Sequence, residues 1–275
     1  MQPEYWDGVQ RERLARVLTF LTPIQYCVVV IPGPVSAVTL RRLESSGYDQ
    51  APVIGPKNTP IGTVPTEYLR TLYQSAILSQ GDPCINRTVI PTNIKLSSFL
   101  ADLTGNSAVL VKGQLGECLG LITIADLNRH SFRATIHELL SELESAIAYI
   151  IESNYHNPMS WILKLAQIEQ DRIVALWSDS LQNNLDIGTT HAATFHQMRK
   201  AIWSSKLCLN DLGYESKRQF KDDTYMLDRI RNNIMHPVRN LIQTPEDISV
   251  LTKSVDKAEV LIKMAHKVRK DRNTN

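Results

Sequence analysis

Cysteine is scarce in this chain of 275 residues, and the cysteines that are present lack any paired spacing. The four residues, Cys27, Cys84, Cys118 and Cys208, lie far apart in the sequence. This distribution excludes the short Cys-x-x-Cys spacing of zinc and redox sites, and it argues against the disulfide framework that is typical of secreted proteins. We therefore expect a cytoplasmic protein without a metal site.

Long hydrophobic runs are also missing. The apolar run from Val17 to Ile31 follows three arginines and in this respect resembles a signal peptide, but Pro23 and Gln25 interrupt it and no small-residue cleavage site follows. No stretch reaches the length that spans a membrane without a polar break. We expect no membrane partner.

A strong excess of one charge sign is the third absence. Hydrophobic residues make up 43% and charged residues 21%, which is typical of globular proteins, and the length allows two ordinary domains. Residues 1–153 carry 12 Lys or Arg against 14 Asp or Glu, whereas residues 154–275 carry 18 against 14. The basic excess of the second part permits nucleic-acid binding, but it is far from the patch of a dedicated binder.

The most unusual stretch that is present is Arg231–Pro237, with the sequence RNNIMHP. The planar fork of an arginine fits phosphate, and histidine moves protons near neutral pH, so the combination suggests chemistry on a phosphodiester. The spacing alone is equally typical of a helix end on a solvated face, where Arg, Asn and His are common. Both interpretations stay open at this point.

Two similar units are predicted between Tyr26 and about Ser131. Each contains a strand, a helix, two strands joined by a glycine-containing turn, and a further helix. Repetition at this length indicates pseudo-symmetric pairing of the two units. The expected elements are residues 26–31, 36–46, 51–54, 61–64 and 66–75 in the first unit, and residues 87–90, 96–103, 107–111 and 118–123 in the second.

The segment Gly120–Leu127, with the sequence GLITIADL, resembles the signature of CBS domains. In that signature a glycine is followed by two apolar residues, a Ser or Thr, two further residues and an Asp. The resemblance implies a tandem module that senses an adenine nucleotide, such as AMP, ADP, ATP or a cyclic adenylate. It also implies that Asp126 holds the ribose hydroxyls, that Thr123 contacts ribose or phosphate, and that backbone around Ile122 frames the base.

The first unit departs from this signature. Aligned on its glycine, the segment Gly62–Leu69 places Pro65 where the second unit has Thr123, and Tyr68 where it has Asp126. Both polar contacts are lost, so we expect at most one adenosine-type site. In the alternative interpretation the pair serves only as a dimerisation scaffold, with Thr123 as a cap and Asp126 at a helix N-terminus.

From Thr135 onward the apolar periodicity is helical, which predicts an all-α bundle. The first helix is expected to couple the two domains. His191 and His196 are five residues apart, a poor spacing for one metal on one helix face, and Trp203 is expected in the core. The further helices are predicted around residues 158–181 and 195–209, from Thr224, and from Pro245, while the stripe on the first helix contains Leu139, Leu140, Leu143, Ala146, Ile147, Ile150 and Ile151.

A helical bundle with Arg-Asn-x-x-x-His on its penultimate helix resembles the HEPN superfamily, over roughly Thr135–Lys270. Catalytic members of that superfamily are metal-independent ribonucleases whose motifs face one another across a dimer. The resemblance implies that His236 acts as general base or acid and that Arg231 stabilises charge on the scissile phosphate. It implies that Asn232 orients the histidine or the substrate, with 2′-hydroxyl attack giving a 2′,3′-cyclic phosphate.

The sequence therefore predicts an α+β protein with a tandem CBS module over residues 1–133 and a HEPN-like helical bundle over residues 134–275. We expect a homodimeric endoribonuclease that cleaves RNA without a catalytic cofactor. An adenine nucleotide is expected to regulate it, and such an activity suits a role in stress or phage defence. The alternative is a non-catalytic nucleotide sensor whose helical domain mediates dimerisation or partner binding. A third interpretation is a structural dimer with neither activity.

Overall fold

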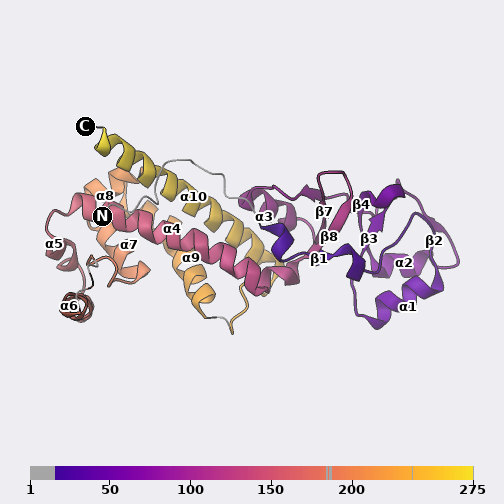
Figure 1. The fold of residues 1–275 in the computed structure, drawn as a ribbon, viewed down its shortest axis with the longest axis horizontal. Coiled ribbons are helices and arrows are strands. Elements are labelled where there is room, and N and C mark those ends of the chain that lie inside the picture. Colours follow the sequence, from indigo (N-terminus) through magenta and orange to yellow (C-terminus); the bar gives the residue numbers. More distant parts are fainter. Residues whose placement is uncertain (1–15, 184, 186–187, 237, 275) are drawn as a thin grey trace. The chain divides into compact units, whose positions relative to one another are not determined.

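The structure, a computed structural model, describes residues 16–183, 185, 188–236 and 238–274 of the chain. It confirms the α+β class. The chain forms two compact units (Figure 1). The β unit contains the described residues through Thr135 together with Asn240–Thr252, and the helical unit contains the remaining described residues. Helices α4 (His130–Asn154) and α10 (Pro245–Asn273) each contribute residues to both units.

The first half of the β unit contains the predicted hairpin. Strands β3 (Gln50–Ile54) and β4 (Pro60–Pro65) pair in antiparallel fashion across the 3₁₀ turn η4 (Pro56–Asn58). A second pair, β2 (Gly33–Pro34) with β5 (Ile77–Leu78), was not predicted.

The predicted strand at residues 26–31 is reduced to one parallel bridge between Val30 and Val53, after the 3₁₀ turn η3 (Ile24–Tyr26). The Val30 N–H donates to the carbonyl of Pro52 at 2.8 Å, and the Ile54 N–H donates to Val30 at 3.0 Å. Pro52 has no N–H to offer Val28, so the parallel ladder cannot extend in that direction.

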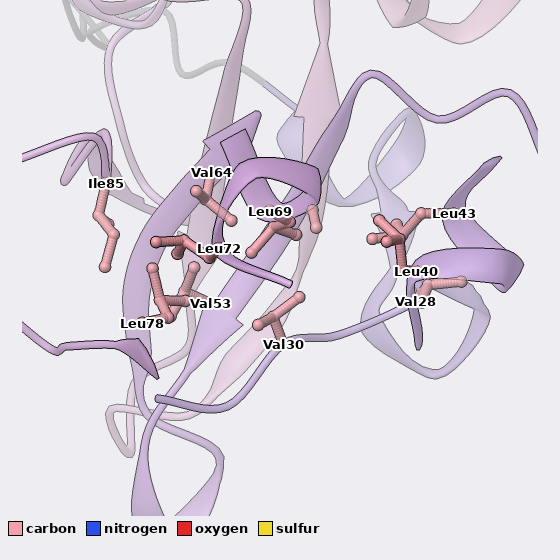
Figure 2. Close-up of a cluster of buried hydrophobic side chains, with 11 residues drawn as sticks. Val28, Val30, Leu40, Leu43, Val53, Val64, Leu69, Leu72, Leu78 and Ile85 are labelled. Atoms are coloured by element: carbon pink, nitrogen blue, oxygen red, sulfur yellow. The ribbon is translucent and has the colours of Figure 1, made fainter. Parts of the chain in front are cut away.

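Two helices cover this half. Helix α1 (Ala37–Ser45) begins at Ser36, whose hydroxyl accepts a hydrogen bond from the Thr39 N–H at 3.0 Å. Helix α2 (Thr66–Leu72) follows β4 directly. Their inner faces pack on the strands in one apolar cluster (Figure 2), which contains Val28, Val30, Leu40, Leu43, Ala51, Val53, Val64, Leu69, Leu72, Leu78 and Ile85.

The second half of the β unit is a four-stranded sheet in the order β1-β8-β7-β6. Helix α3 (Leu96–Thr104) joins β6 to β7, and the 3₁₀ helix η5 (Ile124–Asn128) leads from β8 into α4. The second predicted unit is confirmed, with the edge strand β1 as an addition. The strands are β1 (Thr22–Pro23), β6 (Val89–Pro91), β7 (Ala108–Lys112) and β8 (Cys118–Thr123).

An aromatic cluster anchors the start of the described chain to this half. The ring of Phe20, just after the 3₁₀ turn η2 (Val17–Thr19), lies 5.2 Å from that of Phe132 and 5.6 Å from that of Phe99. All three side chains are fully buried. Residues 17–23 are therefore an integral part of the β unit.

The helical unit confirms the predicted stripe on α4, whose seven apolar residues are all buried. The later helices differ from the prediction at several points, and the segment predicted as one helix at residues 158–181 is divided into helices at residues 158–162 and 167–182. The predicted third helix is interrupted at Ser205, which caps a separate helix by accepting from the Cys208 N–H at 3.3 Å. The helices are α5 (Pro158–Ile162), α6 (Gln167–Gln182), α7 (Phe195–Trp203), α8 (Lys206–Asp211) and α9 (Lys217–Met235), besides α4 and α10.

The fourth predicted helix, α9, begins seven residues earlier than Thr224. Ser216 caps it by accepting from the Gln219 N–H at 3.2 Å, and Phe220 is fully buried in its first turns. The polar composition of residues 212–223 concealed this start. On α6 two large apolar side chains face solvent, since Ile168 is 79% exposed and Leu181 is 50% exposed.

Ion pairs join the long helices of the helical unit, which lie beside one another in Figure 1. Arg231 of α9 contacts Glu144 of α4 at 3.0 Å, and Lys257 of α10 contacts Asp223 of α9 at 2.6 Å. These contacts place one face of α9 against its neighbours, so that the opposite face is left for solvent.

Candidate functional site

The two halves of the β unit pair in a reciprocal way around their signature glycines. Thr63, the residue after Gly62, exchanges two backbone hydrogen bonds of 2.8 Å with Asn86, in the segment that leads into the second half. Leu121, the residue after Gly120, pairs with Thr22, in the segment that leads into the first half. The predicted pseudo-symmetry therefore extends to individual backbone pairs.

Thr123 and Asp126 come together at the end of β8, as the CBS resemblance implies. One Asp126 carboxylate oxygen, Oδ2, accepts hydrogen bonds from the Thr123 N–H at 2.7 Å and from the Thr123 hydroxyl at 3.0 Å. The pair forms a capping box that starts η5. The Asp126 side chain is 6% exposed, so the carboxylate lies at the bottom of this junction.

Arg129 closes the other side of Asp126. Its guanidinium lies 2.8 Å from Asp126 Oδ1 and also donates to the carbonyl of Phe20 at 3.0 Å and to the Thr22 hydroxyl at 3.0 Å. The Arg129 side chain is 46% exposed. Burial raises the pKa of the Cys27 thiol to about 11, and the Asp126 charge adds to this rise. Asp126 is thus a paired carboxylate whose arginine partner reaches solvent.

Ile122, the third predicted nucleotide-binding residue, has a fully buried side chain in β8 and pairs with Val109 of β7. Only its backbone is suited to the predicted role. In the first half, Pro65 and Tyr68 occupy the positions that correspond to Thr123 and Asp126, as the sequence predicted. Pro65 precedes α2 without a side-chain cap, and the Tyr68 hydroxyl donates to Asp82 Oδ2 at 2.9 Å, a bond that raises the pKa of Tyr68 to about 12.

The three predicted catalytic residues lie at the end of α9, and the structure places them differently from one another. The Arg231 Nε–H donates to Glu144 Oε1 at 3.0 Å, and its side chain is 28% exposed. Asn232 is exposed. His236 is also exposed and follows the last helical residue, Met235, with non-helical backbone angles. Pro237, the last residue of the stretch Arg231–Pro237, lies outside the described residues.

A second polar group adjoins this motif and was missed in the sequence. His196 of α7 lies with its ring nitrogen Nδ1 3.0 Å from Asp228 Oδ2 of α9. The same oxygen lies 3.1 Å from the guanidinium of Arg199, which is nearly fully buried. Asp228 precedes Asn232 by four residues, a spacing that puts both on one helix face. That spacing was visible in the sequence, whereas the contribution of α7 was not.

Within the described residues, every helix is either too short or too polar to cross a membrane. In the same part of the chain, no group of three or more His, Cys, Asp or Glu side chains is arranged to hold a metal ion.

Comparisons with known proteins bear on the N-terminal part of the chain. No protein-family model and no curated protein matches the sequence. The chain is similar to a CBS domain protein from Streptococcus pneumoniae, with 18% identity and a TM-score of 0.36 over 44% of this chain and 89% of that one. It is also similar to CbpB in complex with c-di-AMP, with 17% identity and a TM-score of 0.37 over 47% of this chain and 92% of that one.

A third similar structure is the CBS domain of a bacterial CNNM/CorC family Mg²⁺ transporter in complex with ATP. It is 20% identical, with a TM-score of 0.34 over 41% of this chain and 84% of that one. The solved structures that resemble the chain over about its first 44% include CBS domain proteins. The HEPN resemblance of the helical unit stays a prediction.

Proposed function

We propose that the chain is a nucleotide-responsive regulator whose β unit binds an adenine nucleotide at the junction of β8 and η5. The observation that carries this proposal is the convergence of Thr123 and Asp126 at that junction, with Asp126 Oδ2 accepting from the Thr123 N–H at 2.7 Å. A carboxylate so placed accepts hydrogen bonds from ribose hydroxyls, and a hydroxyl beside it donates to ribose or phosphate oxygen.

Arg129 is the group that gives way to the ligand. An ionised carboxylate has about four acceptor sites, and three are engaged by Thr123 and Arg129. The half-exposed Arg129 side chain is the partner that moves most easily, since the two Thr123 groups are part of the cap. Its displacement also weakens the hold on Phe20 and Thr22, which gives the β unit two states that a ligand can distinguish.

A binding panel tests this proposal. AMP, ADP, ATP and c-di-AMP are titrated against the full chain by calorimetry and by thermal shift. ATP and c-di-AMP are included because two of the similar solved structures are complexes with these nucleotides. A ligand at 100 times its Kd stabilises the fold by about 2.7 kcal/mol. Asp126→Asn should weaken binding at least tenfold, whereas Tyr68→Phe at the equivalent position of the first half should not. Equal affinity in wild type and Asp126→Asn would refute the site.

A second function, for the helical unit, is metal-independent cleavage of RNA. It is favoured by one observation: Asn232 and His236, four residues apart, are both exposed at the end of α9. In this proposal His236 transfers a proton at the 2′-hydroxyl or the leaving oxygen, and Arg231 stabilises the phosphate charge. Two chains form a dimer, and the nucleotide state of the β unit sets the rate.

Cleavage is tested with structured RNA in the presence of EDTA. The expected products are fragments that end in 2′,3′-cyclic phosphate, and His236→Ala should reduce their formation at least a hundredfold. The matched control is His191→Ala, because His191 is another exposed histidine of the helical unit. Equal rates in wild type and His236→Ala would show that the motif does not cut RNA. Without activity, the nucleotide sensor remains a separate proposal with its own test.

A further inference from the structure

We propose that His196 is a second proton-transfer residue of the RNA-cleaving site and that Asp228 positions it. The inference rests on the proposed ribonuclease activity, and it gives one chain both a general base and a general acid. The motif of one chain contains a single histidine, so a chain that relied on this motif alone would need the His236 of its dimer partner for the other proton transfer.

The geometry of His196 is that of an oriented imidazole. A carboxylate accepts hydrogen bonds and does not donate them, so the contact of 3.0 Å to Asp228 Oδ2 fixes a proton on His196 Nδ1. In the neutral ring the lone pair is then on Nε2. The His196 side chain is 48% exposed, which leaves room for a substrate beside it.

Asp228 is itself held in place. The Arg199 guanidinium donates to Asp228 Oδ2 at 3.1 Å and to the Thr224 hydroxyl at 2.9 Å. The Arg199 side chain is 4% exposed and Thr224 is fully buried, so this pair of contacts is part of the packed interface between α7 and α9. A carboxylate anchored in this way orients the imidazole without moving itself.

The position of Asp228 links His196 to the predicted catalytic residues. Asp228 and Asn232 are four residues apart and share one face of α9, and His236 follows the last helical residue, Met235. From Asp228 to Met235 the helix rises by about 10 Å, and Asn232 lies near the middle of this stretch. In the proposed arrangement a phosphate lies beside Asn232, between His196 at the Asp228 end of this stretch and His236 just after the helix.

The groups that face His196 make its surroundings suitable for an anion. Its ring packs edge-on against Trp203 with centroids 6.4 Å apart, and Lys221 Nζ lies 4.4 Å from the centre of the Trp203 ring. Lys217 Nζ lies 5.8 Å from the same centre. On the α6 side, Glu169 is neutralised by Lys200 at 2.8 Å. Two lysines of α9 thus lie beside the Trp203 ring that His196 contacts, and their positive charge favours a phosphodiester chain there.

The proposed step is balanced within one chain. His196 Nε2 takes the proton of the 2′-hydroxyl, and the 2′-oxygen forms a bond to phosphorus. The bond from phosphorus to the 5′-oxygen breaks, and that oxygen takes a proton from the protonated His236. The products are a 2′,3′-cyclic phosphate and a 5′-hydroxyl, and the two histidines return to their starting forms by exchanging protons with water.

The test distinguishes the proposed general acid from the proposed general base by changing the leaving group. The probe is a pool of RNA oligonucleotides of random sequence, 2′-O-methylated except at one central ribonucleotide, with either oxygen or sulfur at the scissile 5′ position. A thiolate leaves without protonation. We expect His236→Ala to cleave the oxygen probe at least a hundredfold more slowly than wild type and to cleave the sulfur probe at close to the wild-type rate. His196→Ala should lose about 10²–10⁴-fold on both.

Further variants test whether the effects are specific to His196 and Asp228. His191→Ala should match wild type on both probes. Asp228→Asn should slow both probes, and combining it with His196→Ala should cause no further loss, because the two residues act as one unit. Thermal melting checks that each variant is folded. Suppose that wild type cuts, and that His196→Ala either keeps the wild-type rate or regains it on the sulfur probe. The role of His196 as base is then refuted, while the ribonuclease proposal stands. A wild type that cuts neither probe refutes the ribonuclease proposal and this inference together.

Discussion

The carbonyl oxygen of Thr22 lies so close to Gly120 that a Cβ on the glycine would come within 2.3 Å of it. Gly62 has the same relationship to the carbonyl oxygen of Asn86, with a Cβ distance of 2.1 Å. Real Cβ atoms do not approach backbone that closely, and backbone cannot swing aside as a flexible side chain can. Both glycines are therefore required by the reciprocal pairing of the two halves.

The first prediction concerns these glycines. Gly62→Ala and Gly120→Ala should each lower the free energy of unfolding of the β unit by roughly 1–3 kcal/mol, because the added methyl group forces two segments apart. Denaturant unfolding monitored by circular dichroism measures the effect. Gly81→Ala is the matched control, since a Cβ at Gly81 has no neighbour within 4 Å. Loss of stability in all three variants alike would contradict the explanation.

The second prediction concerns the segment of residues 17–23. Phe20→Ala should destabilise the β unit by about 3–5 kcal/mol, because it removes a fully buried ring from the cluster with Phe99 and Phe132. Leu18→Ala, two residues away and 60% exposed in the wild type, should change stability by less than about 0.5 kcal/mol. The two melting curves decide whether this segment is a structural part of the unit.

The third prediction separates the structural role of Arg231 from its chemical role. Arg231→Ala and Glu144→Ala should each cost up to about 1 kcal/mol, and the double variant little more, because they remove the same partly exposed ion pair. RNA cleavage should be lost only with Arg231→Ala. Equal cleavage by both single variants would reduce Arg231 to a packing residue.

The fourth prediction is a pH dependence at Glu169. Burial raises the pKa of this carboxyl, but the hydrogen bond from Lys200 and the backbone N–H of Ala166 outweigh burial and lower it below 4.5. A carboxyl with a lowered pKa in the folded state stabilises the fold above its unfolded pKa, and this stability is lost as the pH falls through the folded value.

Glu169→Gln should therefore lower the free energy of unfolding by up to about 1 kcal/mol at pH 7, and the difference from wild type should shrink below about pH 4. Unfolding curves from pH 7 to pH 3 measure it. Glu215→Gln replaces an exposed carboxylate of the same unit and should show no such trend. A difference that grows toward low pH would have the wrong sign and refute the assignment.

Periodicity predicted the fold well where one face of an element is buried. The stripe on α4 and the hairpin of β3 and β4 follow from alternation that burial imposes on the sequence. Periodicity failed where a contact with a residue distant in sequence decides where an element begins or ends. The bridge at Val30 stops because of Pro52, on another strand, and α9 extends back to Lys217 because Phe220 finds a buried position.

The candidate sites show the same division. Thr123 and Asp126 are three residues apart, so the sequence alone indicated their contact. Arg129 closes that site by reaching Phe20, which is 109 residues away in the chain. His196 and Asp228 are separated by 32 residues and meet only because α7 packs on α9. No local spacing contains that information.

The reciprocal pairing of the halves also has a consequence for how the chain is made. On the ribosome the first half emerges before Thr22 and Thr63 have their partners from the second half, because Leu121 and Asn86 have not yet been synthesised. Contacts between residues this far apart close slowly, since a long loop must be ordered first. The nascent first half therefore exposes backbone N–H and C=O groups at these two positions until the second half is translated.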